Sequence, residues 1–530
     1  MDIVLGSKVS PAVSPVGGLD LSTDPLFIDD NKATYLDNVD ITDRGLVFRQ
    51  VLSDSGIATS SDPINGLGFP SFEDGTTALA VHTKTTFKTT TSTSLTNRSG
   101  AGILTGGANG DLTRNTTVLD HYFFCNGVNE VAYWDGSSAN CAKITSHGSY
   151  SGPTALIAKY LAGFAGRLIL AVTDESGVKG RRIRWCADSS WWLWDTSADI
   201  GSGAVDFADT PGLVTGIKVH QSSLLVFKND SIYFGRETGD VNSPIVFPNW
   251  INVGCLSGDS AQTLNATQLI FLGTDNVYLL EGTTTTPIGT PVFSEILDTI
   301  DYARLDEIVS WIEPDRTRYV LCIPTNDSTK ITSAFVYDWQ RGKWSTRTYP
   351  GGIYATTSAA LTQSILIDDI SSQIDTVTSS IDSFGAEPAK QILYLSSSYD
   401  ASTYTINKLS SGVSDSYSGG SSINARFDTK DFSPSPGQES TLRGVWLTMS
   451  GVTLSGGGVG LSVSTDRGEN FNYSTSIVSA ASGNFRRLFI PTGTGGISGE
   501  YFRLSITWVN NEWTLHSIEV SYQQRGRRQS

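Results

Sequence analysis

A hairpin pattern that recurs along the chain constrains the fold more than any other feature of this sequence. Residues 223–239 (SLLVFKNDSIYFGRETG) and 269–282 (LIFLGTDNVYLLEG) both contain an apolar run, a short turn with Asn and Asp, and a second apolar run centred on Tyr. Two such runs separated by turn residues are typical of a β-hairpin. Further candidates begin at Ala78, Tyr122, Arg167, Arg318 and Ile392.

The spacing of these hairpins favours a β-propeller. Their first residues recur at roughly 45 to 55 residues, with one wider gap before the last, and this is about the length of a four-stranded blade. A single blade leaves apolar faces uncovered, whereas neighbouring blades in a closed ring cover them. The seven candidates, the last of them irregular, therefore predict an all-β chain with a six- or seven-bladed propeller over residues 56–415. The abundance of Gly, Ser and Thr and the low share of charged residues, 17%, agree with short strands and tight turns.

The wide gap contains an insertion near residues 362–390. Its Ile-Asp pairs begin at Ile367, Ile374 and Ile381 and repeat every seven residues, which describes a narrow helical stripe. Many Ser and Thr residues make an isolated helix marginal here. The insertion is expected either to pack on its own propeller or to become ordered against a neighbouring subunit.

The two ends of the chain differ from the middle. Residues 1–55 are extended in character, with Pro at 11, 15 and 25, and close with a strand. They are interpreted as a docking segment that needs a partner surface, either its own propeller or another chain. Residues 416–530 begin as a linker and continue as short alternating strands, which predicts an antiparallel β-sandwich. Within it, one face of residues 501–508 should lie in the core: Phe502, Leu504, Ile506 and Trp508. The basic tail that follows, with Arg525, Arg527 and Arg528, is interpreted either as solvated or as a docking tail.

Charge and cysteine content narrow the function classes. A net charge of -16 disfavours adhesion to nucleic acid or anionic lipid, although DNA could pass without binding. Five cysteines in odd number, without CxxC spacing, indicate free buried thiols in a protein made in a reducing cytoplasm: Cys125, Cys141, Cys186, Cys255 and Cys322. No signal peptide and no membrane-spanning run are indicated.

No catalytic, cofactor-binding or metal-binding residues are assigned, and the chain is not expected to be an enzyme. The five histidines show no local metal-ligand spacing: His82, His121, His147, His220 and His516. One stretch, STDRGENF, with Ser464, Asp466, Gly468 and Phe471, resembles the Asp-box of sialidases and related propellers. Because an Asp-box is itself a turn, and this one occurs once and outside the blades, we interpret it as structural.

The opening stretch from Gly17 to Asp40 and the later stretch with Tyr337, Asp338 and Trp344 resemble the tail nozzle (tubular protein B-like) proteins of short-tailed phages. The opening stretch carries a G-G-L-[ND]-L motif and then an L-x-N-V-D strand, at Gly17, Gly18, Leu19, Asp20, Leu21, Pro25, Leu36, Asn38, Val39 and Asp40. The blade ending FVYDWQRGKWSTR, with Tyr337, Asp338 and Trp344, is similar to a strand-turn-strand of the same proteins, as are the insertion and the late sandwich.

This resemblance implies a structural virion protein of the phage tail, assembled in the cytoplasm of the host bacterium. It implies a homohexameric ring beneath the portal and adaptor, whose channel conducts the genome during ejection, with tail fibres or tailspikes as further partners. The composition adds that an acidic lumen would guide DNA without binding it.

The rival interpretation is a propeller-type tail protein that binds or degrades host glycans. Aromatic side chains can stack on sugars, and SSWWLWD offers the obvious patch, with Trp191, Trp192 and Trp194. The alternative for these three residues is packing between blades.

Overall fold

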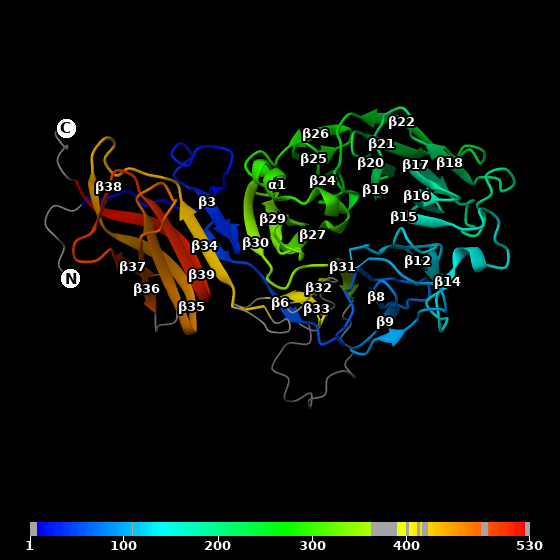
Figure 1. Cartoon of the computed structure of the whole chain (residues 1–530), viewed down its shortest axis with the longest axis horizontal. Coiled ribbons are helices and arrows are strands. Elements are labelled where there is room, and N and C mark those ends of the chain that lie inside the picture. The colour runs from blue at the N-terminus through cyan, green and yellow to red at the C-terminus, as the bar shows by residue number, and fades with distance from the viewer. Residues whose placement is uncertain are drawn as a thin grey trace, which may run out of the picture. The chain divides into compact units, whose positions relative to one another are not determined.

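The computed structural model describes residues 8–108, 110–361, 390–398, 402–410, 414–415, 422–478 and 486–524. The chain is mostly β and separates into two compact units (Figure 1). Unit 1 comprises Met1–Leu52, Phe207–Ile353 and Ser410–Ser530, and unit 2 comprises Ser53–Asp206 and Tyr354–Leu409. Both units are therefore assembled from segments that are far apart in the sequence.

Six separate four-stranded sheets form the blades of a six-bladed β-propeller, and four of them involve unit 2. The first has β7 (Gly66–Gly68), β8 (Leu79–His82), β9 (Phe87–Thr90) and β10 (Thr96–Asn97). The second has β11 (Arg114–Val118), β12 (His121–Cys125), β13 (Ala132–Trp134) and β14 (Ala142–Lys143). The third has β15 (Ile157–Phe164), β16 (Arg167–Asp174), β17 (Val178–Trp185) and β18 (Gly203–Asp206).

The remaining sheet of this group joins the two ends of the propeller sequence. Its first three strands, β31 (Ala355–Leu361), β32 (Lys390–Ser397) and β33 (Thr405–Ser410), follow one another, but its fourth is β6 (Val51–Asp54). Ser55 extends the association, since its N–H donates to the carbonyl of Ile406. A strand from near the start of the chain thus completes the last blade, as ring closure requires.

Unit 1 contains the other two blades. One has β19 (Val214–His220), β20 (Ser223–Lys228), β21 (Ile232–Glu237) and β22 (Ile245–Ile251). The next has β23 (Gln262–Thr263), β24 (Gln268–Leu272), β25 (Val277–Glu281) and β26 (Thr284–Pro287). Short helices follow: α1 (Phe293–Thr299), η3 (Tyr302–Glu307) and η4 (Pro314–Arg316), with η1 (Ile144–Ser146) and η2 (Gly258–Ser260) earlier in the chain.

All seven predicted hairpins are confirmed, and each supplies two adjacent strands of a four-stranded antiparallel run. The hairpin at Arg318 gives β28 (Arg318–Ile323) and β29 (Ser333–Asp338), flanked by β27 (Val309–Glu313) and β30 (Lys343–Thr348). This run is not a separate sheet, because β30 continues into a larger one. The count of blades that the sequence left open is therefore six.

The larger sheet has fifteen strands and joins both ends of the chain to β27–β30. Its N-terminal members are β1 (Lys8–Val9), β2 (Gly18–Leu19), β3 (Lys32–Asp37), β4 (Val39–Thr42) and β5 (Gly45–Phe48). Its C-terminal members are β34 (Asn424–Thr429), β35 (Ser440–Ser464), β36 (Tyr473–Val478), β37 (Arg486–Pro491), β38 (Ile497–Gly499) and β39 (Arg503–Gln524). β3 pairs antiparallel with β34 and parallel with β2 and β30, so the sheet is mixed.

The C-terminal strands pair antiparallel as predicted, but hydrogen bonds join them to the N-terminal strands in one sheet. The predicted core face of β39 is confirmed, since Phe502, Leu504, Ile506 and Trp508 are all at most 1% exposed. Contacts therefore group the ranges 1–55 and 416–530 together with part of the propeller sequence. The heptad insertion at 362–389 and the tail at 525–530 lie outside the described residues.

Candidate functional site

The residues that carry the nozzle resemblance form the joint between the N-terminal strands and the rest of unit 1. Gly17 lies against Asn31, whose carbonyl oxygen would be 2.6 Å from a Cβ at this position, so no larger residue fits. The buried Asp20 accepts hydrogen bonds from Ser22 and from Lys32 Nζ at 3.0 Å. Leu19, Leu36 and Val39 are buried in the core of unit 1. The motif is therefore packed within unit 1, and docking of the N-terminal segment to another chain stays a prediction.

The backbone conformation and the hydrogen bonds at position 38 explain why this motif has an asparagine there. Its φ of 59° is left-handed, a conformation that Asn tolerates better than most residues. Its Oδ1 accepts from Arg49 Nε at 2.8 Å and from the Thr348 N–H at 3.1 Å. Its Nδ2 donates to Asp37 at 2.8 Å and to the carbonyl of Asn424 at 3.0 Å. One side chain thereby ties together β3, β30 and β34.

Asp40 anchors a buried ion-pair network. Arg347 Nη2 lies 2.8 Å from Asp40 Oδ1, and Arg347 Nη1 lies 2.6 Å from Glu313 Oε1, with all three side chains at most 4% exposed. Arg316 contacts Asp40 Oδ2 at 2.8 Å. Burial alone would raise the pKa of Asp40, but Arg347, together with two further arginines, holds it below the usual value.

Further buried ion pairs lie at the turn after Tyr337 and near the start of the C-terminal region. Asp338 pairs with Arg318 and, at 2.9 Å, with Arg341. A second buried pair joins Arg49 to Asp415 at 2.7 Å, with both side chains 1% exposed. This anchored residue directly precedes residues 416–530, which the sequence predicted to begin as a linker, and the composition did not reveal it.

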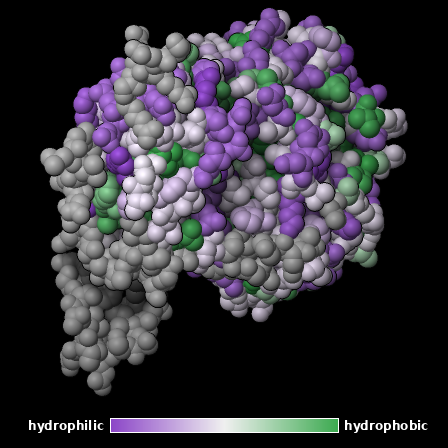
Figure 2. All heavy atoms as spheres, turned by 60° about the vertical axis from the view of Figure 1, so that its left-hand side comes forward, coloured by the Kyte–Doolittle hydropathy of each residue, from purple (hydrophilic) through white to green (hydrophobic). Residues whose placement is uncertain are grey.

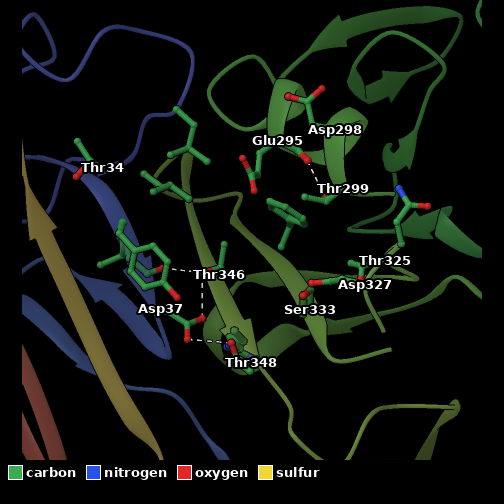
Figure 3. A pocket seen from close by; sticks show the side chains of 18 residues that line it. Thr34, Asp37, Glu295, Asp298, Thr299, Thr325, Asp327, Ser333, Thr346 and Thr348 are labelled. Atoms are coloured by element: carbon green, nitrogen blue, oxygen red, sulfur yellow. Dashed lines mark hydrogen bonds between the residues drawn. The ribbon is translucent and has the colours of Figure 1, made fainter. Parts of the chain in front are cut away.

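A pocket of about 580 Å³ opens in unit 1 beside this joint. Its walls come from β3, α1, β29, β30 and the stretch Thr325–Asp327 (Figure 3). Apolar side chains line part of it, at Leu19, Leu21, Leu36, Ala334 and Phe335. The size and the mixture of apolar and polar walls are those of a small-molecule or side-chain binding site.

Asp37 lies in the pocket wall and is only 6% exposed. It accepts from Thr346 Oγ1 at 3.0 Å and from Thr348 Oγ1 at 2.9 Å, as Figure 3 shows. Burial raises the pKa of Asp37 despite these hydrogen bonds. The neighbouring Tyr35 also lines the pocket, and burial followed by the charge of Asp37 raises its pKa to about 12.

The pocket rim is acidic. Glu295 and Asp298 come from α1, on the other side of the pocket from Asp37 in Figure 3, and Asp327 comes from the loop after β28. All three are exposed, and no ion pair within the described part of the chain involves them. Among the lining residues Arg347 is the one cation, and Asp40 and Glu313 neutralise it. The pocket therefore attracts cations and repels anions.

The Asp-box stretch forms the expected turn. Ser464 Oγ donates to Asp466 Oδ1 at 2.6 Å and accepts from the Gly468 N–H at 2.8 Å, while the Asn470 N–H donates to Asp466 Oδ1 at 2.9 Å. The Ser464 hydroxyl and the groups of Asn470 lower the pKa of Asp466 to about 2. Phe471 instead lies against Arg426, whose guanidinium carbon is 5.5 Å from the ring centre.

The tryptophan patch proposed for sugar stacking is largely buried. Trp191 is 3% exposed and Trp194 0%, and the Trp194 indole donates to the carbonyl of Trp191 at 2.6 Å. Trp192 is half-buried and stacks on His147 at 4.9 Å. Trp191 and Trp194 therefore pack in the core, as the alternative to sugar stacking predicted. On the face drawn in Figure 2, hydrophobic residues appear only as small separate patches.

The remaining sequence candidates are the histidines and the cysteines. His82 is fully buried, with Tyr122 Oη 2.8 Å from its Nε2, and burial lowers the pKa of His82 to about 3. All five cysteines are free and buried, as expected. Within the described ranges, no group of three or more His, Cys, Asp or Glu side chains is arranged to hold a metal ion. No described helix is both long and apolar enough to cross a membrane.

Comparisons with known proteins yield no family. No family model matches the chain, and no curated protein matches it. Among solved structures, the WD40 domain of Pan2 from Neurospora crassa is 8% identical with a TM-score of 0.37, over 65% of this chain and 89% of that one. The extracellular domain of a hybrid two-component system of B. thetaiotaomicron is 6% identical with a TM-score of 0.40, over 69% of this chain and 40% of that one. Such scores are too low to carry an argument, and the fold assignment rests on the strand pairings.

Proposed function

We propose that this chain is a tail nozzle subunit of a short-tailed phage: a structural virion protein, not an enzyme. Six copies would form a ring below the portal and adaptor, and its channel would conduct the DNA genome during ejection. Its partners would be further copies of itself, the adaptor, and tail fibres or tailspikes. It would be made and assembled in the cytoplasm of the host bacterium.

The observation that carries this proposal is the structural use of the shared motif. The residues that resemble nozzle proteins, from Gly17 to Asp40, pair with β30, β34 and the ion-pair network rather than lying in unrelated loops. A resemblance that coincides with the main joint of a domain is better supported than one confined to surface turns. The turn with Asp338, from the second resembling stretch, belongs to the same network.

The charge of the molecule agrees with a conduit. Every phosphate neutralised by Lys or Arg adds affinity through counterion release, so a channel that must let DNA pass should avoid clustered cations. The chain carries 53 acidic residues against 37 basic ones, and three of these acids lie at the pocket rim without ion partners in the described residues. Which acids would face DNA is left open by this argument.

Copy number in purified phage particles tests the proposal first. Quantitative peptide mass spectrometry should find about half as many copies of this chain as of the portal protein. A trimeric, fibre-like number, or absence from particles, would contradict a sixfold ring. In that case a glycan array would be the next measurement, starting from the half-buried Trp192.

A further inference from the structure

We propose that one face of the fifteen-stranded sheet of unit 1 binds a neutral oligosaccharide, with Tyr35 as the ring on which a sugar stacks. The inference goes beyond the proposed nozzle role and does not depend on it. It rests on the side chains that the strand register brings to this face, which is called the hydroxyl face below.

The strand register places short hydroxyl side chains beside one another on the hydroxyl face. β3, β34, β39, β35 and β36 are neighbours in this order (Figure 1). Directly opposite residues of paired strands point to the same face of a sheet. One row across these strands is Asp37, Arg426, Thr507, Gly460 and Ser476, and the next row is Tyr35, Asp428, Ser505, Ser462 and Ser474.

The other face of the same strands belongs to the core. Leu36, Phe427 and Ile506 are opposite one another on it and are at most 1% exposed. On the hydroxyl face, by contrast, Ser474 and Ser476 are exposed. A sheet that packs on one side only presents its second side to solvent, and here that side is available to a ligand.

An aromatic stack stands at one end of the hydroxyl face. The guanidinium carbon of Arg426 lies 4.6 Å from the ring centre of Tyr35 and 5.5 Å from that of Phe471. Asp428 holds this guanidinium through two hydrogen bonds, from Nε at 2.9 Å and from Nη2 at 2.5 Å. Tyr35 remains 42% exposed although Arg426 covers part of its ring. The fixed, exposed ring is suited to stack on the apolar face of a pyranose.

The groups around this ring match the hydroxyls of a sugar. A serine or threonine hydroxyl both donates and accepts hydrogen bonds, as a sugar hydroxyl does. Ser462 Oγ already bonds to Ser474 Oγ at 3.2 Å, so neighbouring strands present such groups at hydrogen-bonding distance. A flat aromatic ring with a few convergent polar groups is the usual composition of a small-ligand site.

The charges on and beside the hydroxyl face favour a neutral ligand. Arg426 balances Asp428, so Asp37 alone among the two rows keeps an unbalanced charge. Tyr35 also lines the acidic pocket described above, so a sugar stacked on it lies at the pocket mouth. An anionic polysaccharide would be repelled there.

A protein partner or a second copy of this chain fits the hydroxyl face less well. The core of a protein interface is rich in apolar and aromatic side chains. Within the two rows and the adjoining turn, Tyr35 and Phe471 are the only such side chains. The hydroxyl face therefore lacks the apolar area that a protein contact needs, whereas a sugar chain needs little of it.

Isothermal titration calorimetry of the full chain tests the binding with three defined neutral probes: maltohexaose, cellohexaose and N-acetylchitohexaose. At least one of them should bind at one site per chain. The affinity should be the same at about 0.05 M and about 0.5 M salt, because salt does not screen an uncharged ligand. A galacturonic acid hexamer has the same length but is anionic, and it should not bind.

Three variants locate the site. Tyr35→Ala should weaken binding about three- to tenfold, the range of one aromatic contact. Thr507→Val keeps the side-chain shape but removes a hydroxyl, and it should weaken binding about two- to tenfold. Tyr302→Ala is the matched control, since Tyr302 is 54% exposed on η3 and lies outside the hydroxyl face, and it should bind as the parent does.

The contrary results are equally distinct. No binding of any of the three neutral probes, or equal binding by Tyr35→Ala and Tyr302→Ala, would overturn the proposal. Binding of the galacturonic acid hexamer as tightly as a neutral probe would overturn the choice of a neutral ligand. Self-association in sedimentation velocity that Tyr35→Ala abolishes, without sugar binding, would assign the face to a second copy instead. Copy number in virions tests the nozzle alone and leaves these measurements unchanged.

Discussion

Asp37 and Asp40 lie three residues apart in sequence, and both are buried, yet their surroundings oppose each other. Asp40 faces Arg347, Arg316 and Arg318, and its pKa is lowered against the effect of burial. Asp37 faces the pocket and two threonine hydroxyls, and burial raises its pKa. One acid therefore belongs to a compensated network and the other to a wall where the negative charge is only partly offset.

The comparison teaches what each region is suited to do. A buried ion pair stabilises little when both partners are present, but removal of one partner leaves an uncompensated charge. The network at Asp40 is thus suited to hold strands in one arrangement. A carboxylate such as Asp37, hydrogen-bonded by hydroxyls beside an open pocket, keeps the wall negative and leaves the site available to a cation.

Loss of Arg347 should have the largest effect. Arg347→Met would leave Asp40 and Glu313 buried without their main cation, and we expect a loss of about 3–5 kcal/mol of unfolding free energy. Urea denaturation measures it. Arg487→Met, in the half-exposed pair with Glu519, is the matched control and should cost about 0–1 kcal/mol. Equal losses of unfolding free energy in the two variants would show that burial does not make the Asp40 network more important for stability than the exposed pair.

Acid titration of two variants sharpens the contrast. Because the folded pKa of Asp40 is lowered, its contribution is present above about pH 4, the unfolded value, and is lost as pH falls through the lower folded value. The cost of Asp40→Asn, about 1–3 kcal/mol near neutrality, should therefore shrink below about pH 4.

Asp37 should behave in the opposite sense. Its folded pKa is raised, so the ionised carboxylate costs stability above that value, and the cost disappears as pH falls towards about 4. Wild-type stability relative to Asp37→Asn should thus improve with acid, and the change should lie above about pH 4. Parallel pH profiles for the two variants, from denaturant midpoints, would contradict the opposite environments.

A smaller effect is expected at the Asp-box turn, away from both acids. Gly468 has a φ of +89°, and a Cβ there would meet Arg503 Nη1. Gly468→Ala should cost about 1–2 kcal/mol from the backbone conformation, and somewhat more from the displaced guanidinium. Gly437→Ala, with a φ of +73° and no atom within 4 Å of the added Cβ, isolates the backbone cost. Thermal unfolding should give a lower Tm for Gly468→Ala than for Gly437→Ala.

The smallest effect should come from the pocket rim. Glu295→Gln, Asp298→Asn and Asp327→Asn alter exposed acids without ion partners in the described residues, so each should change stability by less than about 0.5 kcal/mol. Calorimetry can check this directly. A large loss would mean that the rim acids stabilise the fold.

The local hairpins could be predicted because their signals lie within about twenty residues of each other. In residues 223–239, apolar alternation defines the strands and Asn229-Asp230 the turn, and the structure places β20 and β21 there. The Asp-box turn and the core face of Phe502 to Trp508 are confirmed for the same reason.

The pocket could not be predicted in this way. Glu295 and Asp298 are three residues apart in sequence, but Asp37 reaches the same pocket through the pairing of β3 with β30. Asp327 reaches it through the bridge between Ile300 and Thr325. The ion pairs of Asp40 likewise join residues 276 and 307 positions apart. No spacing rule in the sequence connects such residues.

The sequence by itself determined the hairpins, the turns and the mostly β character, because turn chemistry and strand alternation act over a few residues. Only the tertiary structure decided that β6 completes the sheet of β31–β33 and that β3 pairs with β34 across almost four hundred residues. Such pairings depend on which edges and apolar faces meet once the chain has folded, and that choice is made by burial and register together rather than by any local motif.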